Sequence, residues 1–537
     1  MRSLPDLESF TLAQQVAQMV VVRASGYLFD HQIQYPAWEP PAAKLQYFIE
    51  DLGVGGVIFL GGSAGELAHR SQQVQNWAKI PLFVAADIEE GVGQRFSGAT
   101  WFPPPMAIGA LAKHNPKRAS EYAAQMGAII ASEALAIGIN WLFAPVVDVN
   151  NNPDNPVINV RAFGETPEVV SQLATAFIQG AQAYPVLTTA KHFPGHGDTA
   201  TDSHLDLPVL PHSPDRLAEI ELPPFQAAIA AGVDAVMSAH LLIPSWDDKF
   251  PATLSQRILT EQLRQKLAFP GLIVTDALVI GAIANRYGSR EAAVLAVEAG
   301  ADILLMPVDP EGAIAAVCAA VESDRISPER IRSSVERIWN AKHKLNSNNP
   351  PGGGVRYKLE GADFISQIAQ PNAFATVNNI LRESLLVRGV VPLSSNKQQD
   401  LHNLIVVDEL LGCDFLSQQA PAIALPRLAG YTTMLCDLHT PIATIDDGGR
   451  PTLLQLFIRG NPFRGSAGLT QVAQAWTKKL LKSGNLQALV IYGSPYVLDR
   501  LLPTLPVEVP CVFSYGQMPA AQEIVMRKLL GSEISLS

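Results

Sequence analysis

The segment Val54-Gly55-Gly56-Val57-Ile58-Phe59-Leu60 is a short apolar run, and a longer stretch with helical periodicity follows it. The same alternation recurs along the chain as far as Val308. Eight runs are candidate strands, at residues 18–22, 54–60, 82–86, 141–149, 186–190, 235–239, 272–275 and 302–306. Runs that are apolar throughout suit a sheet buried on both faces, and eight parallel strands can close without an exposed edge. The pattern therefore predicts a (β/α)8 TIM barrel.

The barrel pattern stops after Lys344. Residues 346–354 read Asn-Ser-Asn-Asn-Pro-Pro-Gly-Gly-Gly, a composition that neither packs nor keeps a regular ladder of backbone hydrogen bonds. Further apolar runs then alternate with helical stretches, at residues 404–407, 433–436, 453–458, 488–492 and 511–514. We therefore expect a catalytic barrel at residues 1–345, a linker at 346–356, and a smaller C-terminal α/β domain with a mostly parallel sheet at 357–537.

The length and composition exclude several classes of protein. A chain of 537 residues is too long for one compact core. Its 17% of charged and 48% of hydrophobic residues exclude collagen-like, wholly disordered and disulfide-scaffold proteins. The 39 Lys and Arg residues against 50 Asp and Glu residues give a net charge of −11, with no Arg-rich run to neutralise a phosphate backbone. Nucleic acid is therefore not an expected partner.

The cysteines and the N-terminus bear on the compartment. The four cysteines are scattered and form no C-x-x-C pair, at Cys318, Cys413, Cys436 and Cys511. This usage favours a reducing compartment over a disulfide framework or a zinc knuckle. Glutamines interrupt the first apolar stretch, which argues against a signal peptide, and no run approaches the roughly 20 apolar residues that span a bilayer. We expect a soluble cytoplasmic protein without a membrane partner, and the oligomeric state stays open.

Polar residues accumulate where the expected strands end. They are Asp87, Lys191, His192, His240 and Asp276. In a barrel of this kind, the side chains just past the carboxyl ends of the strands surround one mouth. Any one of them alone is better explained as a solvated loop residue or a structural histidine. Their convergence predicts a functional site.

The segment from Lys191 to His204 holds the densest set of reactive side chains, and it has two interpretations. In the first, His192, His196, Asp198, Asp202 and His204 bind a divalent metal ion, since all are of suitable type. Their spacing matches no standard metal signature, so we expect neither a metal nor another cofactor.

In the second interpretation, Asp202 accepts the imidazole N–H of His204 and fixes its tautomer. The other ring nitrogen is then free to pass a proton to a leaving group. Side chains two residues apart point the same way on an extended loop. A carboxylate at Asp276 supplies the matching nucleophile. These residues together indicate a hydrolytic or group-transfer enzyme.

The run from Lys191 to His204, followed by Leu207-Pro208, resembles the signature of the β-N-acetylglucosaminidase branch of glycoside hydrolase family 3. Other segments resemble the family in the same order along the chain, at residues 87–91 with 95–96, 155–158 with 161–164, 251–255 and 275–278. The second half resembles the family's C-terminal domain more loosely, at residues 492–496 and 514–516.

This resemblance implies a role for each matching residue. Asp276 is the nucleophile that forms a glycosyl-enzyme intermediate, and His204 with Asp202 is the acid/base dyad. The implied substrate-binding residues hold the hydroxyls and acetamide of N-acetylglucosamine, and we add His240 from the end of the sixth strand: Asp87, Arg95, Arg161, Lys191, His192 and His240. The implied activity is a retaining exo-glycosidase that releases β-linked N-acetylglucosamine from peptidoglycan-derived muropeptides.

Three alternatives and two departures accompany this interpretation. A phosphorylase would use the same Asp276 and His204, whereas a β-glucosidase of the family would lack the His/Asp loop. A non-catalytic sugar-binding protein would lack the nucleophile or the dyad. Glu90 stands where the family usually has a glycine, and Asn159-Val160 replaces a common Gly-Asp. We expect both departures to adjoin the sugar pocket, with Glu90 narrowing or re-aiming its rim and so changing the leaving-group preference.

Overall fold

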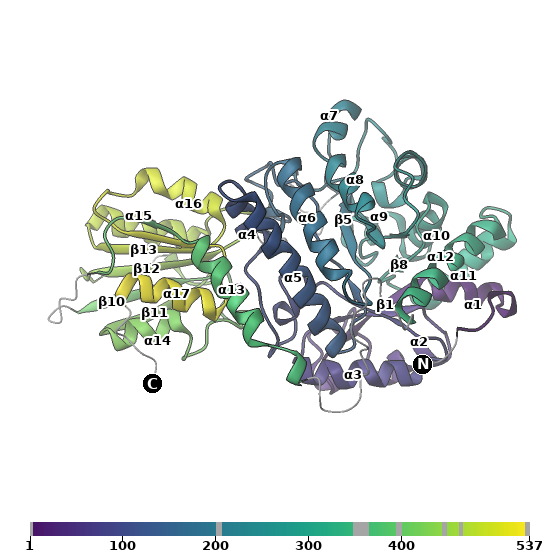
Figure 1. Ribbon diagram of the computed structural model, residues 1–537, viewed down its shortest axis with the longest axis horizontal. Coiled ribbons are helices and arrows are strands. Elements are labelled where there is room, and N and C mark those ends of the chain that lie inside the picture. Colours follow the sequence, from purple (N-terminus) through teal and green to yellow (C-terminus); the bar gives the residue numbers. More distant parts are fainter. Residues whose placement is uncertain are drawn as a thin grey trace.

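The computed structural model describes residues 4–199, 207–346, 365–393, 400–442, 448–460 and 466–531. Figure 1 shows a barrel built from the first part of the chain beside a smaller α/β domain built from the last part. Within the parts of the chain that the structure describes, no helix is long and apolar enough to cross a membrane.

Eight parallel strands form the barrel. They are β1 (Val20–Ser25), β2 (Gly56–Leu60), β3 (Phe83–Ala86), β4 (Trp141–Leu142), β5 (Thr189–Phe193), β6 (Ala235–Ser238), β7 (Leu272–Val274) and β8 (Leu304–Leu305). Hydrogen-bonded ladders join them in the orders β4-β3-β2-β1-β8 and β5-β6-β7. Isolated parallel bridges, Trp141 to Leu187 and Val274 to Ile303, connect the two ladders. The predicted (β/α)8 fold is confirmed.

Two strand boundaries differ from the predicted ones in a way that matters for the site. The fourth strand ends at Leu142 rather than at Val149, and Pro145, which has no N–H to donate to a ladder, follows shortly after it. The fifth strand continues to Phe193, so Lys191 and His192 lie within β5 rather than after it. The register between β5 and β6 shifts between Lys191 and Phe193, which is where the polar side chains stand.

Helices cover the outside of the barrel. They are α1 (Leu12–Gln18), α2 (Ala42–Glu50), α3 (Ala64–Trp77), α4 (Pro105–Ala112), α5 (Pro116–Ala136), α6 (Pro167–Ala181), α7 (Pro214–Glu219), α8 (Leu222–Ala230), the π-helical η6 (Arg257–Lys266), α9 (Gly281–Tyr287), α10 (Ser289–Ala299), α11 (Pro310–Glu322) and α12 (Pro328–Asn346). Several begin with a capping side chain followed by proline. Thr166 accepts the N–H of Val169, and Ser213 accepts that of Arg216. Such caps satisfy N–H groups that have no partner inside the helix.

The second domain contains a six-stranded sheet in the order β11-β10-β12-β13-β14-β9. Its strands are β9 (Leu386–Arg388), β10 (Leu401–Val406), β11 (Tyr431–Cys436), β12 (Thr452–Ile458), β13 (Leu486–Gly493) and β14 (Cys511–Ser514). All the ladders are parallel except that between β14 and β9. The five predicted runs are therefore strands of a mostly parallel sheet. The edge strand β9, which is three residues long and largely exposed, was not predicted.

Helices lie on both faces of this second sheet. They are α14 (Pro421–Leu428), α15 (Gln471–Ser483), α16 (Pro495–Leu501) and α17 (Pro519–Leu530). Helix α13 (Pro371–Glu383) packs against α4 and α5 of the barrel and also against α17 (Figure 1). The expected linker, apart from Asn346, lies outside the described residues, and the predicted domain boundaries stay a prediction.

Candidate active site

A buried lysine organises one side of the barrel mouth. Lys191 on β5 is 1% exposed. Its Nζ donates to Asp87 Oδ1 at 2.7 Å and lies 2.6 Å from Glu89 Oε1. Burial alone would lower the pKa of Lys191, but the Asp87 and Glu89 carboxylates outweigh it and raise that pKa. Lys191 is therefore a fixed positive charge beside Asp87.

Glu89 links Lys191 to Arg161. The Arg161 guanidinium donates Nε and Nη2 hydrogen bonds to the two Glu89 carboxylate oxygens, each at 2.8 Å. Burial would raise the pKa of Glu89, but Arg161 and Lys191 hold it well below its usual value. Glu89 was not among the predicted site residues. The available signal was its position two residues after Asp87, which favours the same side of an extended segment.

Asp148, which was also not among the predicted site residues, orients two histidines at the mouth. This buried carboxylate lies 2.8 Å from His192 Nδ1, and it accepts the backbone N–H of His192 at 3.1 Å and that of His196 at 2.7 Å. An ionised Asp148 places the His192 proton on Nδ1 and leaves Nε2 as the other ring nitrogen. Its position near the end of the expected fourth strand was the signal that could have identified it.

Asp276 lies two residues after the end of β7 and is half-buried. Its Oδ1 accepts the N–H of Ala277 at 2.7 Å. Burial lowers the pKa of His196 to about 4, while the negative charges of Asp148 and Asp276 act in the opposite direction. The charge of Asp276 thus acts on the histidine segment that follows β5.

The structure places His240 and Arg95 differently from the other predicted binding residues. His240 is fully buried, with Nδ1 2.8 Å from Thr253 Oγ1 and Nε2 3.1 Å from the carbonyl oxygen of Ala277. This arrangement favours a role in supporting the turn that carries Asp276 over the expected sugar contact. Arg95 is exposed, and its Nε donates to the carbonyl oxygen of Asp87 at 3.0 Å.

The predicted dyad, Asp202 and His204, lies in residues 200–206, outside the described part of the chain. The described members of the alternative metal-binding set turn to separate partners. His192 contacts Asp148, His196 contacts Thr199, and Asp198 pairs with His212 at 2.9 Å. Among the residues that the structure describes, no three His, Cys, Asp or Glu side chains gather to hold a metal ion.

The two departures from the family pattern contact the second domain, and the expectation that Glu90 narrows or re-aims the rim of the sugar pocket stays a prediction. Glu90 is 1% exposed and pairs with Arg459. Asn159 is also 1% exposed, and its φ of 45° lies in the left-handed region, which glycine and asparagine tolerate best. Gly460 of the second domain lies directly against Asn159, so both residues lie where the domains meet.

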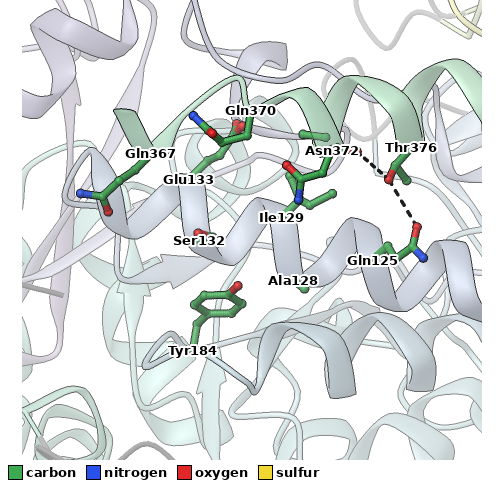
Figure 2. A pocket seen from close by; sticks show the side chains of 11 residues that line it. Gln125, Ala128, Ile129, Ser132, Glu133, Tyr184, Gln367, Gln370, Asn372 and Thr376 are labelled. Atoms are coloured by element: carbon green, nitrogen blue, oxygen red, sulfur yellow. Dashed lines mark hydrogen bonds between the residues drawn. The ribbon is translucent and has the colours of Figure 1, made fainter. Parts of the chain in front are cut away.

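A separate cavity of about 410 Å³ lies where α13 meets α5 (Figure 2). Carboxamide side chains from the two sides line it, including Gln125, Gln367 and Gln370. Thr376 Oγ1 donates to Gln125 Oε1 at 3.3 Å across this joint. The lining residues differ from all those that converge at the barrel mouth, so this cavity is distinct from the candidate active site.

Comparisons with known proteins match both domains. Residues 11–341 match the Glycosyl hydrolase family 3 N terminal domain, and residues 394–531 match the Bacterial Glycosyl hydrolase family 3 C-terminal domain. Beta-hexosaminidase A of Pseudoalteromonas piscicida is 34% identical over 390 residues, which are 67% of this chain and 63% of that protein. Beta-N-acetylglucosaminidase/beta-glucosidase of Cellulomonas fimi is 29% identical over 75% of this chain and 71% of that protein.

A solved structure resembles the whole chain. A glycoside hydrolase family 3 beta-N-acetylglucosaminidase from Paenibacillus sp. str. FPU-7 superposes with a TM-score of 0.81. It is 31% identical in sequence, and the match covers 98% of each chain. The two-domain arrangement is thus shared along the full length.

Proposed function

The chain belongs to glycoside hydrolase family 3, and from this premise we propose that it is a retaining β-N-acetylhexosaminidase that releases terminal β-linked N-acetylglucosamine. The observation that carries the proposal is the arrangement of charge at the mouth. The Asp276 carboxylate follows β7, and the connected charges of Asp87, Lys191, Glu89 and Arg161 stand at the carboxyl ends of β3 to β5. A nucleophile and a charged, multi-donor sugar site are what this reaction needs.

In the proposed mechanism, an Asp276 carboxylate oxygen attacks the anomeric carbon as the bond to the leaving-group oxygen breaks. His204, oriented by Asp202, gives its proton to that departing oxygen. The product of this step is a glycosyl ester on Asp276 and a free alcohol. His204 then takes a proton from water, the water oxygen attacks the anomeric carbon, and Asp276 leaves as a carboxylate. The configuration is retained after two displacements.

The sugar-binding network supports both displacements. Asp87 keeps a partly exposed carboxylate, with 37% of its side chain accessible, while Lys191 and Glu89 beneath it are buried. A fixed set of charged donors and acceptors strengthens its bonds to ring hydroxyls as oxocarbenium character develops. A neutral histidine base also avoids placing a second anion near the glycosyl ester when water attacks.

We further propose that the natural substrates are muropeptide fragments in the cytoplasm, in which N-acetylglucosamine is linked to an anhydro-muramyl sugar that carries a peptide. The residue-by-residue resemblance to the branch signature supports the substrate class. The four cysteines are free thiols, which supports a reducing compartment. Release of N-acetylglucosamine from purified muropeptides tests the substrate, and fractionation of the native host tests the compartment.

The central experiment uses Asp276→Ala. We expect turnover of 4-nitrophenyl N-acetylglucosaminide to fall at least 10³-fold, because the covalent intermediate no longer forms. A 2-fluoro glycosyl donor should label wild-type Asp276, as mass spectrometry of the digested protein would show. Asp248→Ala, which removes an exposed carboxylate from the loop after β6, is the matched control and should keep full activity.

Three results would contradict the assignment. They are retained activity in Asp276→Ala, labelling of another carboxylate, and a preference for the corresponding glucoside. The same assays with and without inorganic phosphate separate hydrolysis from phosphorolysis, because a phosphorylase would release the sugar 1-phosphate instead of the free sugar.

A further inference from the structure

A partly buried ion pair joins the second domain to the segment that carries the sugar-binding carboxylates. Arg459 follows the end of β12, and its Nη2 donates to Glu90 Oε1 at 2.6 Å while its Nη1 donates to Glu90 Oε2 at 3.2 Å. Trp101 Nε1 also donates to Glu90 Oε2, at 3.2 Å. Because Glu90 is 1% exposed, its carboxylate depends on these partners for the hydrogen bonds that water would otherwise supply.

The next residue of the second domain meets the barrel at a second point. A Cβ atom at Gly460 would lie 2.8 Å from Asn159 Cβ and 2.8 Å from the carbonyl oxygen of Pro156. Contacts this short exclude a side chain, so the backbone at Gly460 approaches the barrel loop directly. Arg459 and Gly460 therefore contact both of the positions at which this chain departs from the family pattern.

Both contact points adjoin residues that hold the sugar-binding network. Glu90 is the neighbour of Glu89, which holds Lys191 and Arg161. Asn159 precedes Arg161 by two residues, in the 3₁₀ turn η4 (Asn159–Arg161). A shift of the backbone at either point would move Glu89 or Arg161 relative to Asp87.

We infer that Arg459 is a positioning residue through which the second domain sets the geometry of the sugar site. It acts through Glu90 on the segment from Asp87 to Glu90, while Gly460 holds the Asn159 turn. Arg459 does not itself contact the sugar in this inference. The expected change in KM rests on the proposed function, whereas the expected change in backbone hydrogen exchange rests on the ion pair alone.

The kinetic test compares Arg459→Met with wild type on 4-nitrophenyl N-acetylglucosaminide. Misplaced binding groups weaken the enzyme–sugar contacts in the ground state and the transition state together, so we expect KM to rise about tenfold with a smaller change in kcat. A residue that only stabilises the fold would reduce the active fraction, lowering the apparent kcat at unchanged KM. Arg459→Met with an unchanged KM would overturn the inference.

Two further variants sharpen the comparison. Arg500 and Asp154 form another ion pair between the domains, and their side chains are 47% and 65% exposed. Arg500→Gln removes this exposed pair and should leave KM unchanged. The double variant Glu90→Gln/Arg459→Met removes the unpaired buried charge, so its KM should lie closer to wild type than that of Arg459→Met. Equal KM values for the single and double variants would contradict a pathway through Glu90.

A readout without substrate separates this inference from the proposed function. In Arg459→Met, backbone hydrogen exchange should increase at least tenfold in peptides covering residues 87–96 and 155–161, with β1 and β6 unchanged. If wild type lacks activity on N-acetylglucosaminides but this exchange pattern appears, the proposed function fails and the positioning role stands. If exchange in these peptides matches wild type, the positioning role fails.

Discussion

Lys342 on α12 is a lysine inside the protein without an ionic partner among the groups that the structure describes around it. It is 1% exposed, and its Nζ donates to Gln18 Oε1 at 2.7 Å and to the carbonyl oxygen of Gly55 at 3.2 Å. The Phe83 ring lies 5.0 Å from the same nitrogen. Because these partners are neutral, burial lowers the pKa of Lys342 to about 7.

This pKa predicts how Lys342→Met affects stability. The unfolded side chain has a pKa of about 10.4, so between pH 7 and 10 the unfolded state binds more protons than the folded state. Wild type therefore gains stability relative to Lys342→Met as pH rises through this window, by up to about 1.4 kcal/mol per pH unit. Urea unfolding of both proteins at pH 6, 8 and 9.5 measures the difference. A difference that does not change with pH would contradict a buried neutral lysine.

The acid role that we propose for His204 predicts a dependence on the leaving group. His204→Ala should slow a disaccharide substrate at least 10²-fold more than an aryl glycoside, because protonation matters most when the departing oxygen is basic. Asp202→Asn should show the same trend more weakly. Steady-state kinetics on the two substrates provide the measurement, and external azide should restore activity on the aryl glycoside. Equal losses on both substrates would indicate a binding or structural role instead.

At the residue scale, side chains near the ends of expected strands were easier to predict than the charged partners that hold them in place. Asp87, Lys191 and Asp276 were predicted because barrel topology brings strand ends together. Glu89 and Asp148 were missed because their roles depend on partners in other segments, Arg161 and His192. Sequence spacing does not reveal such pairs. The pairing of Glu90 with Arg459 was not predicted for the same reason, since Arg459 lies in the other domain.

At the scale of elements, apolar runs located the strands, and hydrogen bonding set their ends. The expected strand at 141–149 is apolar almost throughout, yet only Trp141–Leu142 belongs to the ladder. In contrast, β5 continues through the polar pair Lys191-His192, because these side chains are buried against Asp87 and Asp148 rather than exposed. In a sequence pattern, polar residues mark the expected end of a strand. In the structure, the pairing of Lys191 and His192 with carboxylates lets β5 continue into the candidate site.

The second sheet divides its faces between two cores. On β12, Leu454, Leu456 and Ile458 belong to one continuous cluster of buried side chains that also contains the barrel core. Leu453 and Phe457 point to the other face and pack in a separate cluster with residues of α14 and α17. Because alternate side chains of a strand point to opposite faces of a sheet, one face of the second sheet packs in the same core as the barrel. Amino-acid composition alone does not indicate this shared core.

For the whole molecule, this shared core predicts that the two domains unfold together, although separate transitions are common in proteins of this size. Ile380 on α13 is fully buried in the shared cluster, where α13 meets α4, α5 and α17. Ile380→Ala should lower the free energy of unfolding by about 2–5 kcal/mol and lower the midpoint of a single transition without splitting it.

Phe374→Ala, on the same helix but 46% exposed, is the matched control and should change the free energy of unfolding by less than about 0.5 kcal/mol. Differential scanning calorimetry measures both, with calorimetric and van't Hoff enthalpies expected to agree. Two resolved transitions in wild type would show that the shared apolar core is too weak to couple the unfolding of the two domains.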